Sequence, residues 1–293
     1  MTGPTAFARH ALLVGVLVIV LVVSMGFHMR SDLEAEFERE KATALAVTPG
    51  VTTPITTEQD IATLPAPVQR YLRASGCLGK PRPAVVHVVF DAVMVRKPGG
   101  TGMPGVAEQI DRFDVPKRLF FMRSRMFGLP VKVLHNYEGH QASMVVRIAS
   151  LFNVVEIHSD ELARTETVTL LNDLAFFAPA WLVDPRLKWR SVDDRQADVT
   201  FTNGPHRITA SLRFNDAGEL VNFVSEDRGA LQDDGSFKYV RWSTPMSDYR
   251  EFNGLRVATQ GEGIWHYPEG EFVYGRMKLR SYTVVHVPRK PLR

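Results

Sequence analysis

The amino-acid sequence predicts an α+β protein that is mainly β. We expect one N-terminal transmembrane helix and then a large curved antiparallel sheet, a half-barrel, with a few covering helices. Three observations predict this class: an uncharged apolar run near the N-terminus, many short β-branched and aromatic segments from residue 84 onward, and a single helical pattern among them. Strands this numerous and closely spaced must form a large curved sheet or barrel.

The apolar run extends from Ala11 to Phe27 and contains no charged residue. A helix of this length is roughly 26 Å long, slightly short of the ~30 Å hydrocarbon core of a bilayer. Arg9 and Arg30 flank the run, and their long side chains can reach the headgroups and so absorb the difference. Residues 11–27 are therefore predicted to form a transmembrane helix.

Two other interpretations of this run are a cleaved signal peptide and a buried core helix. The segment Gly26 to Arg30 that follows the run lacks the small residues of a cleavage site, which favours a retained signal-anchor. Arg9 lies before the run, whereas a series of acidic residues follows Arg30. Because basic residues stay on the cytoplasmic side, we expect a single-pass protein of the cell membrane with residues 1–10 cytoplasmic and the rest extracytoplasmic.

Residues 31–46 have the composition of a juxtamembrane helix, with Leu33, Phe37 and Ala44 on one face. Residues 47–57 are rich in proline and threonine and read as a linker. The domain proper is predicted to cover residues 58–286, beginning with a helical segment that Gly76 ends, and residues 287–293 form a basic tail.

The clearest strand pattern lies between Arg207 and Phe214, where apolar and polar residues alternate strictly. A period of two indicates a half-buried antiparallel strand. Residues 215–218 form a turn signal, so residues 219–227 should return as the partner of a hairpin. Ten similar segments lie near residues 85–96, 106–114, 118–127, 131–138, 141–149, 187–192, 196–202, 237–250, 255–266 and 271–286.

A single helix is predicted from Asp160 to Phe177, ending before Pro179, and its apolar face should cover part of the sheet. The strand at residues 119–127 carries aromatic and methionine residues at both parities. One of its faces could pack on a helix while the other lines a concave apolar cavity.

These patterns predict a site for a lipid or another hydrophobic ligand, because methionine and aromatic side chains suit irregular apolar molecules. Ordinary core filling is the alternative interpretation. The candidate ligand-binding residues are Met94, Phe121, Met122, Met126, Met144, Phe176, Phe177, Arg228, Arg241, Trp242 and Met277.

The sequence predicts no catalytic residue, no metal ligand and no cofactor. Residues 100–105 match Gly-x-Gly-x-x-Gly, but Pro104 and a strand follow where nucleotide binding requires a helix. A metal site could be assembled only from dispersed residues: His135, His140, His158 and Glu161. A polar patch could form from Asp227, Arg228, Arg241, Asp248 and Tyr249. The balance of 35 basic and 32 acidic residues argues against binding to nucleic acid.

Three segments together resemble a bacterial domain family of unknown function: residues 64–72, residues 173–179, and residues 248–254 with 261–265. The resemblance covers roughly residues 60–286 and implies no activity or catalytic residue. The layout of strands and helices also resembles the lipoprotein-carrier group (LolA-like and LppX-like), whose curved antiparallel sheet encloses helices and holds acyl chains.

The sequence thus predicts a single-pass membrane protein whose extracytoplasmic domain binds a lipid or other hydrophobic molecule in a concave sheet. Two alternatives stay open: a membrane-bound enzyme, with or without a metal ion, and a structural or assembly protein that uses residues 31–45 to bind a partner. The pattern identifies neither the ligand nor any protein partner.

Overall fold

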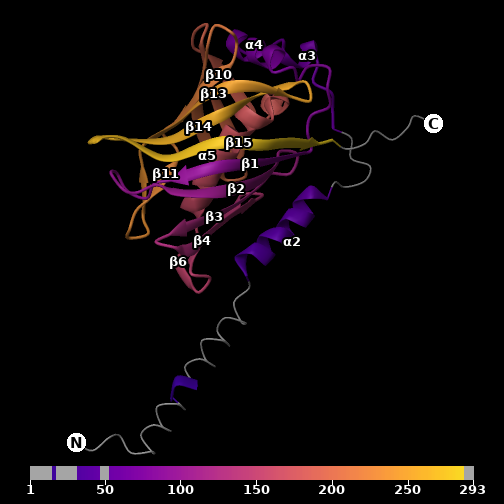
Figure 1. Ribbon diagram of the computed structural model, residues 1–293. Helices are drawn as coiled ribbons and strands as arrows, with labels where there is room; N and C mark the ends of the chain where they lie inside the picture. Colours follow the sequence, from indigo (N-terminus) through magenta and orange to yellow (C-terminus); the bar gives the residue numbers. More distant parts are fainter. Residues whose placement is uncertain (1–14, 18–31, 47–52, 287–293) are drawn as a thin grey trace, which may run out of the picture.

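The computed structural model describes residues 15–17, 32–46 and 53–286. It confirms a mainly β protein built on one large antiparallel sheet, with few helices (Figure 1). The strands of this sheet are β1 (Val85–Met94), β2 (Met103–Arg112), β3 (Lys117–Met126), β4 (Leu129–Glu138), β5 (Gln141–Ile148), β6 (Phe152–His158), β7 (Leu187–Ser191), β8 (Gln196–Asn203), β9 (His206–Phe214), β10 (Leu220–Ser225), β13 (Arg241–Phe252), β14 (Leu255–Tyr267) and β15 (Gly270–Val285).

The 13 strands follow the order β6-β5-β4-β3-β2-β1-β15-β14-β13-β10-β9-β8-β7. Strands β6 and β7 form its two edges, so the sheet is open and not a closed barrel. Most neighbours are joined by hairpins, and the last long strand, β15, returns to pair with β1. A separate two-stranded sheet is formed by β11 (Gly229–Leu231) and β12 (Phe237–Tyr239).

The central helix α5 (Asp160–Phe177) begins where the Ser159 side chain accepts a hydrogen bond from the Leu162 amide. It ends before Pro179, which starts a short 3-10 helix, η1 (Pro179–Val183). The helix is buried almost all round, since only Asp160, Glu161 and Arg164 lie outside the buried class. It is therefore enclosed by the domain, whereas the sequence pattern had suggested a helix that covers the sheet with one face.

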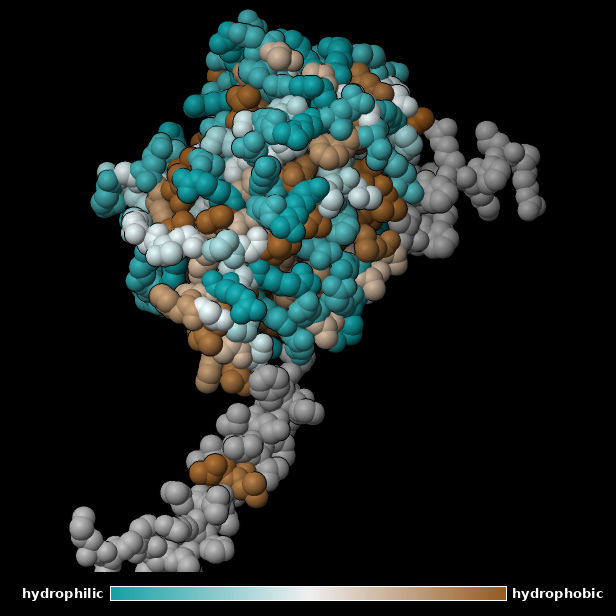
Figure 2. All heavy atoms as spheres, viewed as in Figure 1, coloured by the Kyte–Doolittle hydropathy of each residue, from teal (hydrophilic) through white to brown (hydrophobic). Residues whose placement is uncertain are grey.

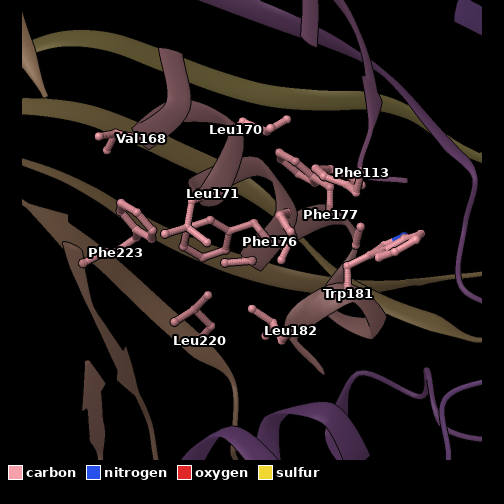
Figure 3. Packing of buried hydrophobic residues seen from close by; sticks show 14 of the residues in the cluster. Phe113, Val168, Leu170, Leu171, Phe176, Phe177, Trp181, Leu182, Leu220 and Phe223 are labelled. Carbon is pink, nitrogen blue, oxygen red and sulfur yellow. The ribbon is translucent and has the colours of Figure 1, made fainter. Parts of the chain in front are cut away.

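The sheet curves around α5. This helix contacts β5 and β6 near one edge of the sheet and β9 and β10 near the other, which a flat sheet of this width would not allow. The side chains of α5 and η1 interdigitate with those of the surrounding strands, as Figure 3 shows for Leu171, Phe176 and Phe223. The main hydrophobic core thus lies inside the concavity of the sheet.

Helix α2 (Leu33–Leu45) packs on the opposite, convex face, against β2, β3 and β4. Its Leu33, Phe37 and Ala44 are buried, and the Phe37 ring stacks on Phe121 of β3 at 4.8 Å between centroids. Ion pairs surround this apolar contact, among them Lys132 with Asp32 at 2.9 Å. Strand β3 is consequently covered on both faces, which explains its apolar residues at both parities.

Helices α3 (Glu58–Ile61) and α4 (Ala66–Ala74) lie together at one end of the domain (Figure 1). Tyr71 of α4 donates a hydrogen bond to the Ala175 carbonyl of α5 at 2.8 Å and lies against Phe214. This contact fixes the C-terminal part of the central helix.

The predicted transmembrane run lies mostly outside the described residues. Only residues 15–17 of it are described, and these are helical. Across residues 15–17, 32–46 and 53–286, no helix is long and apolar enough to cross a membrane. Residues 47–52 of the predicted linker and the basic tail at 287–293 also lie outside the described ranges.

Candidate functional site: an apolar cavity with a buried polar end

A cavity of about 170 Å³ lies between α5 and the concave face of the sheet. It is comparable in size to an engineered apolar cavity of ~150 Å³ that binds benzene. Strands from the middle of the sheet form most of its wall, and α5 forms the rest. Its apolar lining comprises Phe90, Met94, Phe120, Phe177, Trp242, Met246, Ala258, Tyr274 and Met277.

The polar end of the cavity is organised around Arg118 of β3. Its Nε donates to Asp173 Oδ2 at 2.7 Å, and its Nη1 donates to Glu166 Oε2 at 3.1 Å. Its Nη2 donates to Gln109 Oε1 at 3.0 Å, and His135 Nδ1 lies 3.0 Å from Glu166 Oε1. Because two of these three acceptors are carboxylates, the charge of Arg118 is already compensated within the protein.

These buried carboxyl groups have different proton affinities. Burial alone would raise the pKa of Glu166, but the charges of Arg118 and His135 outweigh it and hold the pKa at about 2. Burial raises the pKa of Asp173, although Arg118 opposes the shift. Burial and the nearby Asp173 raise the pKa of Asp111 well above its ordinary value. Glu166 therefore carries a negative charge at neutral pH, whereas Asp111 holds its proton to a higher pH than an exposed aspartate does.

Arg228 forms a second cationic group at the cavity, in a different environment. Its guanidinium carbon lies 4.5 Å from the ring centre of Trp242, 5.0 Å from that of Trp265 and 5.9 Å from that of Tyr274. Its Nε donates to Thr169 Oγ1 at 3.1 Å. Among the described residues, Arg228 forms no ion pair with a carboxylate. The aromatic faces hold the guanidinium plane and leave its terminal N–H groups without a charged acceptor.

A second hollow, of about 430 Å³, adjoins the first cavity. Both are lined by Met246, Gly261 and Met277. Gly261 has no side chain, and a Cβ added there would overlap the sulfur of Met246. Pro245 lacks an N–H and interrupts the pairing of β13 with β14 at this point. The two hollows therefore share part of their wall, to which both methionines contribute.

The structure brings five of the eleven candidate ligand-binding residues to the cavity: Met94, Phe177, Arg228, Trp242 and Met277. Met122, Met144 and Phe176 are buried in the main core without reaching it. Met126 lies at the end of β3, away from the cavity.

Phe121 and Arg241 do not line the cavity. Phe121 points to the convex face, under α2. Arg241 is exposed and pairs with Glu226 at 2.8 Å. Successive strand residues point to opposite faces, so Phe121 and Met122 could not have faced one cavity together.

Sequence reasoning missed most of the polar end. Glu166, Thr169 and Asp173 lie on one face of α5 at the spacing of a helix, in a segment that is otherwise apolar. Arg118 stands at the same parity as Phe120 on β3, between buried neighbours. Charged groups at core-facing positions were the available signal, because such groups are buried only when they are paired.

The residues of the hypothetical metal site and polar patch do not gather. In the described part of the chain, no group of three or more His, Cys, Asp or Glu side chains could hold a metal ion. Asp227 pairs with Arg164 and accepts hydrogen bonds from Thr209, whereas the Tyr249 hydroxyl donates to the Leu220 carbonyl. The proposed patch is thus divided among separate local contacts.

Residues 54–277 match the model of a family described as "Family of unknown function (DUF6544)". This match confirms the resemblance to a family of unknown function. A search of curated proteins found no match to the chain.

The solved structures that are similar to this chain include the following three. One, a domain described as an outer membrane lipoprotein-sorting protein from Vibrio parahaemolyticus, is 7% identical, with a TM-score of 0.41 over 69% of this chain and 85% of that one. A DUF1329 family protein from Desulfovibrio piger is 11% identical, with a TM-score of 0.42 over 76% of this chain and 94% of that one. A LolA superfamily protein from Nitrosomonas europaea is 9% identical, with a TM-score of 0.41 over 75% of this chain and 94% of that one. Such TM-scores are too low to support a functional argument.

Proposed function

Because this chain belongs to a family of unknown function, we propose its function from its own cavity: it binds a hydrophobic molecule that has an anionic end, while tethered to a membrane. The observation that carries the proposal is Arg228, a cation on the wall of a mostly apolar cavity that forms no ion pair with a carboxylate of the described residues, although its charge helps to lower the pKa of Glu166. An apolar ligand body would lie against Phe120, Phe177 and Met277, and its anionic end would accept hydrogen bonds from Arg228.

The two arginines at the cavity have different roles in this proposal. Arg118 forms ion pairs with Glu166 and Asp173 and a hydrogen bond with Gln109, so its charge is compensated without a ligand. Arg228 is held by aromatic faces and one hydroxyl, which leaves donors for an added acceptor. A carboxylate or phosphate ester fits this arrangement better than a neutral group does.

Binding of a fluorescent fatty acid to the delipidated full-length chain tests the proposal. We expect Arg228→Met to weaken binding roughly tenfold, since a hydrogen bond to a charged group contributes ~1.5–3 kcal/mol. Arg241→Met is the matched control, because Arg241 is exposed and lies outside the cavity. A fluorescent alcohol of the same chain length should show a smaller difference between wild type and Arg228→Met.

Equal affinities of wild type and Arg228→Met would contradict the anionic end of the proposal. Absence of any binding, together with no lipid extracted from the purified chain by mass spectrometry, would contradict the proposal as a whole. Ala258→Leu provides a further check. Ala258 lines the cavity, so the larger side chain should reduce the cavity volume and weaken binding of the fatty acid.

The proposed tether is the apolar run at residues 11–27, with the N-terminus in the cytoplasm and the domain outside the cell membrane. Extraction of membranes with alkaline carbonate should leave the full-length protein in the pellet. Protease added to intact cells stripped of any outer barrier should digest the domain. Release by carbonate, or protection from the protease, would contradict the anchor or its orientation respectively.

A further inference from the structure

We infer that the end of the domain next to the start of α2 lies on the membrane surface and inserts apolar side chains into it. This inference rests on the proposed membrane anchor. The surface in question, the apolar tip, comprises Phe127, Leu129, Phe152 and Val154. Their exposed fractions are 96%, 50%, 65% and 55%. Apolar side chains gather at this lower end of the domain in Figure 2.

The turn between β3 and β4 is the first reason. Met126 pairs with Leu129, so the turn has two residues, Phe127 with φ of 51° and Gly128 with φ of 82°. A two-residue hairpin with positive φ at both positions favours asparagine, aspartate or glycine at the first. Phenylalanine there is strained, and its ring contacts almost nothing in the domain. Folding of the domain alone does not account for a phenylalanine at this position.

Strand β6 contributes the second part of the tip. It is an edge strand, and its outward positions begin with Phe152 and Val154. Exposed edges of soluble sheets usually carry charges that prevent association. The turn before β6 lies beside the start of β4, because the Ala149 amide donates to the Pro130 carbonyl at 2.8 Å. Two separate hairpins therefore present apolar side chains at the same end of the sheet.

The chain itself brings this end close to the predicted transmembrane run. Lys132 of β4 binds both Asp32 and Glu34 at 2.9 Å, which fixes the start of α2 three residues along β4 from Leu129. Figure 1 shows the start of α2 and the turn before β6 at the same end of the domain. The apolar run ends at Phe27, and the five residues from there to Asp32 span at most about 18 Å. A helix that leaves the bilayer at Phe27 thus holds the tip at the headgroups.

The charge beside the tip also suits a lipid surface. Arg125 is exposed, and its Nη1 donates to the Gly128 carbonyl at 3.2 Å within the same turn. It forms no ion pair with a carboxylate of the described residues. Apolar side chains that project beyond an arginine match the interface of a bilayer with anionic headgroups.

Spin labels on the full-length protein in vesicles of phosphatidylcholine and phosphatidylglycerol test the inference. One label replaces Phe152 in the tip (Phe152→Cys), and a matched label replaces Val115 (Val115→Cys), which is 53% exposed in the turn at the other end of β3. The native Cys77 is buried. We expect the label at 152 to be several-fold less accessible to a water-soluble nickel reagent than the label at 115, and more accessible to oxygen, which concentrates in lipid.

Equal accessibility of the two labels to both reagents would overturn the inference. Protection of the label at 152 from both nickel and oxygen would also overturn it, because contact with a protein excludes both reagents. Phe127→Asn provides a second test. It should leave the unfolding midpoint in detergent unchanged or raise it, since asparagine suits the turn, and it should move the accessibility at 152 toward that at 115.

Carbonate extraction of the same preparations separates this inference from the anchor. If the protein stays in the membrane and the two labels are equally accessible, the insertion of the apolar tip is overturned and the anchor is left intact. Released protein whose label at 152 is still protected by vesicles from nickel and accessible to oxygen would contradict the anchor and support the tip. If the protein is released and the two labels are equally accessible, both the anchor and the insertion of the apolar tip are overturned.

Discussion

At the scale of single residues, the polar end of the cavity depends on Arg118. Its guanidinium is the common partner of Glu166 and Asp173, and all three groups are buried. Breaking a buried ion pair from one side leaves an uncompensated charge, which is more damaging than the pair itself is stabilising. Of these two carboxylates, His135 contacts only Glu166.

Arg118→Met should lower the free energy of unfolding by about 3–5 kcal/mol, because Glu166 and Asp173 lose their shared counter-charge. Urea unfolding of the full-length protein in detergent measures this change. Arg241→Met serves as the control and should change stability by less than ~1 kcal/mol, since its ion pair with Glu226 is exposed. Similar losses in both variants would show that burial of the network does not matter.

For Asp111 we expect the opposite effect on stability, because its replacement should stabilise the fold at neutral pH. Its pKa is raised well above the ordinary value of 3.8, so the folded protein holds this proton to a higher pH than the unfolded chain does. This group therefore makes the fold less stable as pH rises above 3.8. Asp111→Asn mimics the protonated form and should raise stability at pH 7, with little effect near pH 4. A variant that is less stable than wild type at pH 7 would contradict the raised pKa of Asp111.

At the scale of elements, α2 behaves as a separate unit on the convex face. Its buried contact consists mainly of Leu33 and Phe37 against β3, and ion pairs surround it. The cavity lies on the other side of the sheet, so its lining shares no residue with this helix. Attachment of α2 and binding in the cavity should be separable.

Phe37→Ala should release α2 from the sheet, because truncation of a buried phenylalanine costs about 3–5 kcal/mol. We expect faster cleavage by a protease within residues 33–45, measured by mass spectrometry of the products, and unchanged affinity for the fluorescent fatty acid. Glu36→Ala on the same helix is the control: it removes a half-buried side chain outside the apolar contact and should leave the cleavage rate unchanged. Loss of fatty-acid binding in Phe37→Ala would show that the two faces of the sheet are coupled.

The sequence patterns that correctly predicted strands and helices were local ones. The alternation at residues 207–214 corresponds to β9 (His206–Phe214), and the helix expected at residues 160–177 is α5. The burial of α5 on nearly all sides could not be read from its sequence, because polar residues such as Glu166 and Asp173 are there satisfied by partners from distant strands. Sequence periodicity records polarity and not the partners that neutralise it.

At the scale of the whole molecule, the sheet curves around α5. This helix contacts strands near both edges of the sheet and also forms one wall of the cavity. The two arms of the sheet, one from β6 to β1 and the other from β15 to β7, thus share one core. We expect the domain to unfold as a single cooperative unit.

Leu171→Ala should lower the free energy of unfolding by about 2–5 kcal/mol, since Leu171 of α5 is fully buried in the main core. Tryptophan fluorescence reports on Trp189, Trp242 and Trp265, which all lie between β7 and β15, and on Trp181 of η1, and far-ultraviolet circular dichroism reports on the whole sheet. The two signals should change at the same urea concentration in wild type and variant. Separate transitions would mean that the arms fold independently of α5.

The sequence by itself determined the class of the domain, the helix in the middle of the strands and the two covered faces of β3, because these follow from periodicities of two and 3.6 along the chain. It also contained the apolar run from which the anchor is proposed. Only the tertiary structure decided which residues meet at the cavity: Phe120 and not Phe121, Arg228 and not Arg241. The physical reason is that parity, curvature and pairing between strands far apart in the chain determine where a side chain points, and no local pattern carries that information.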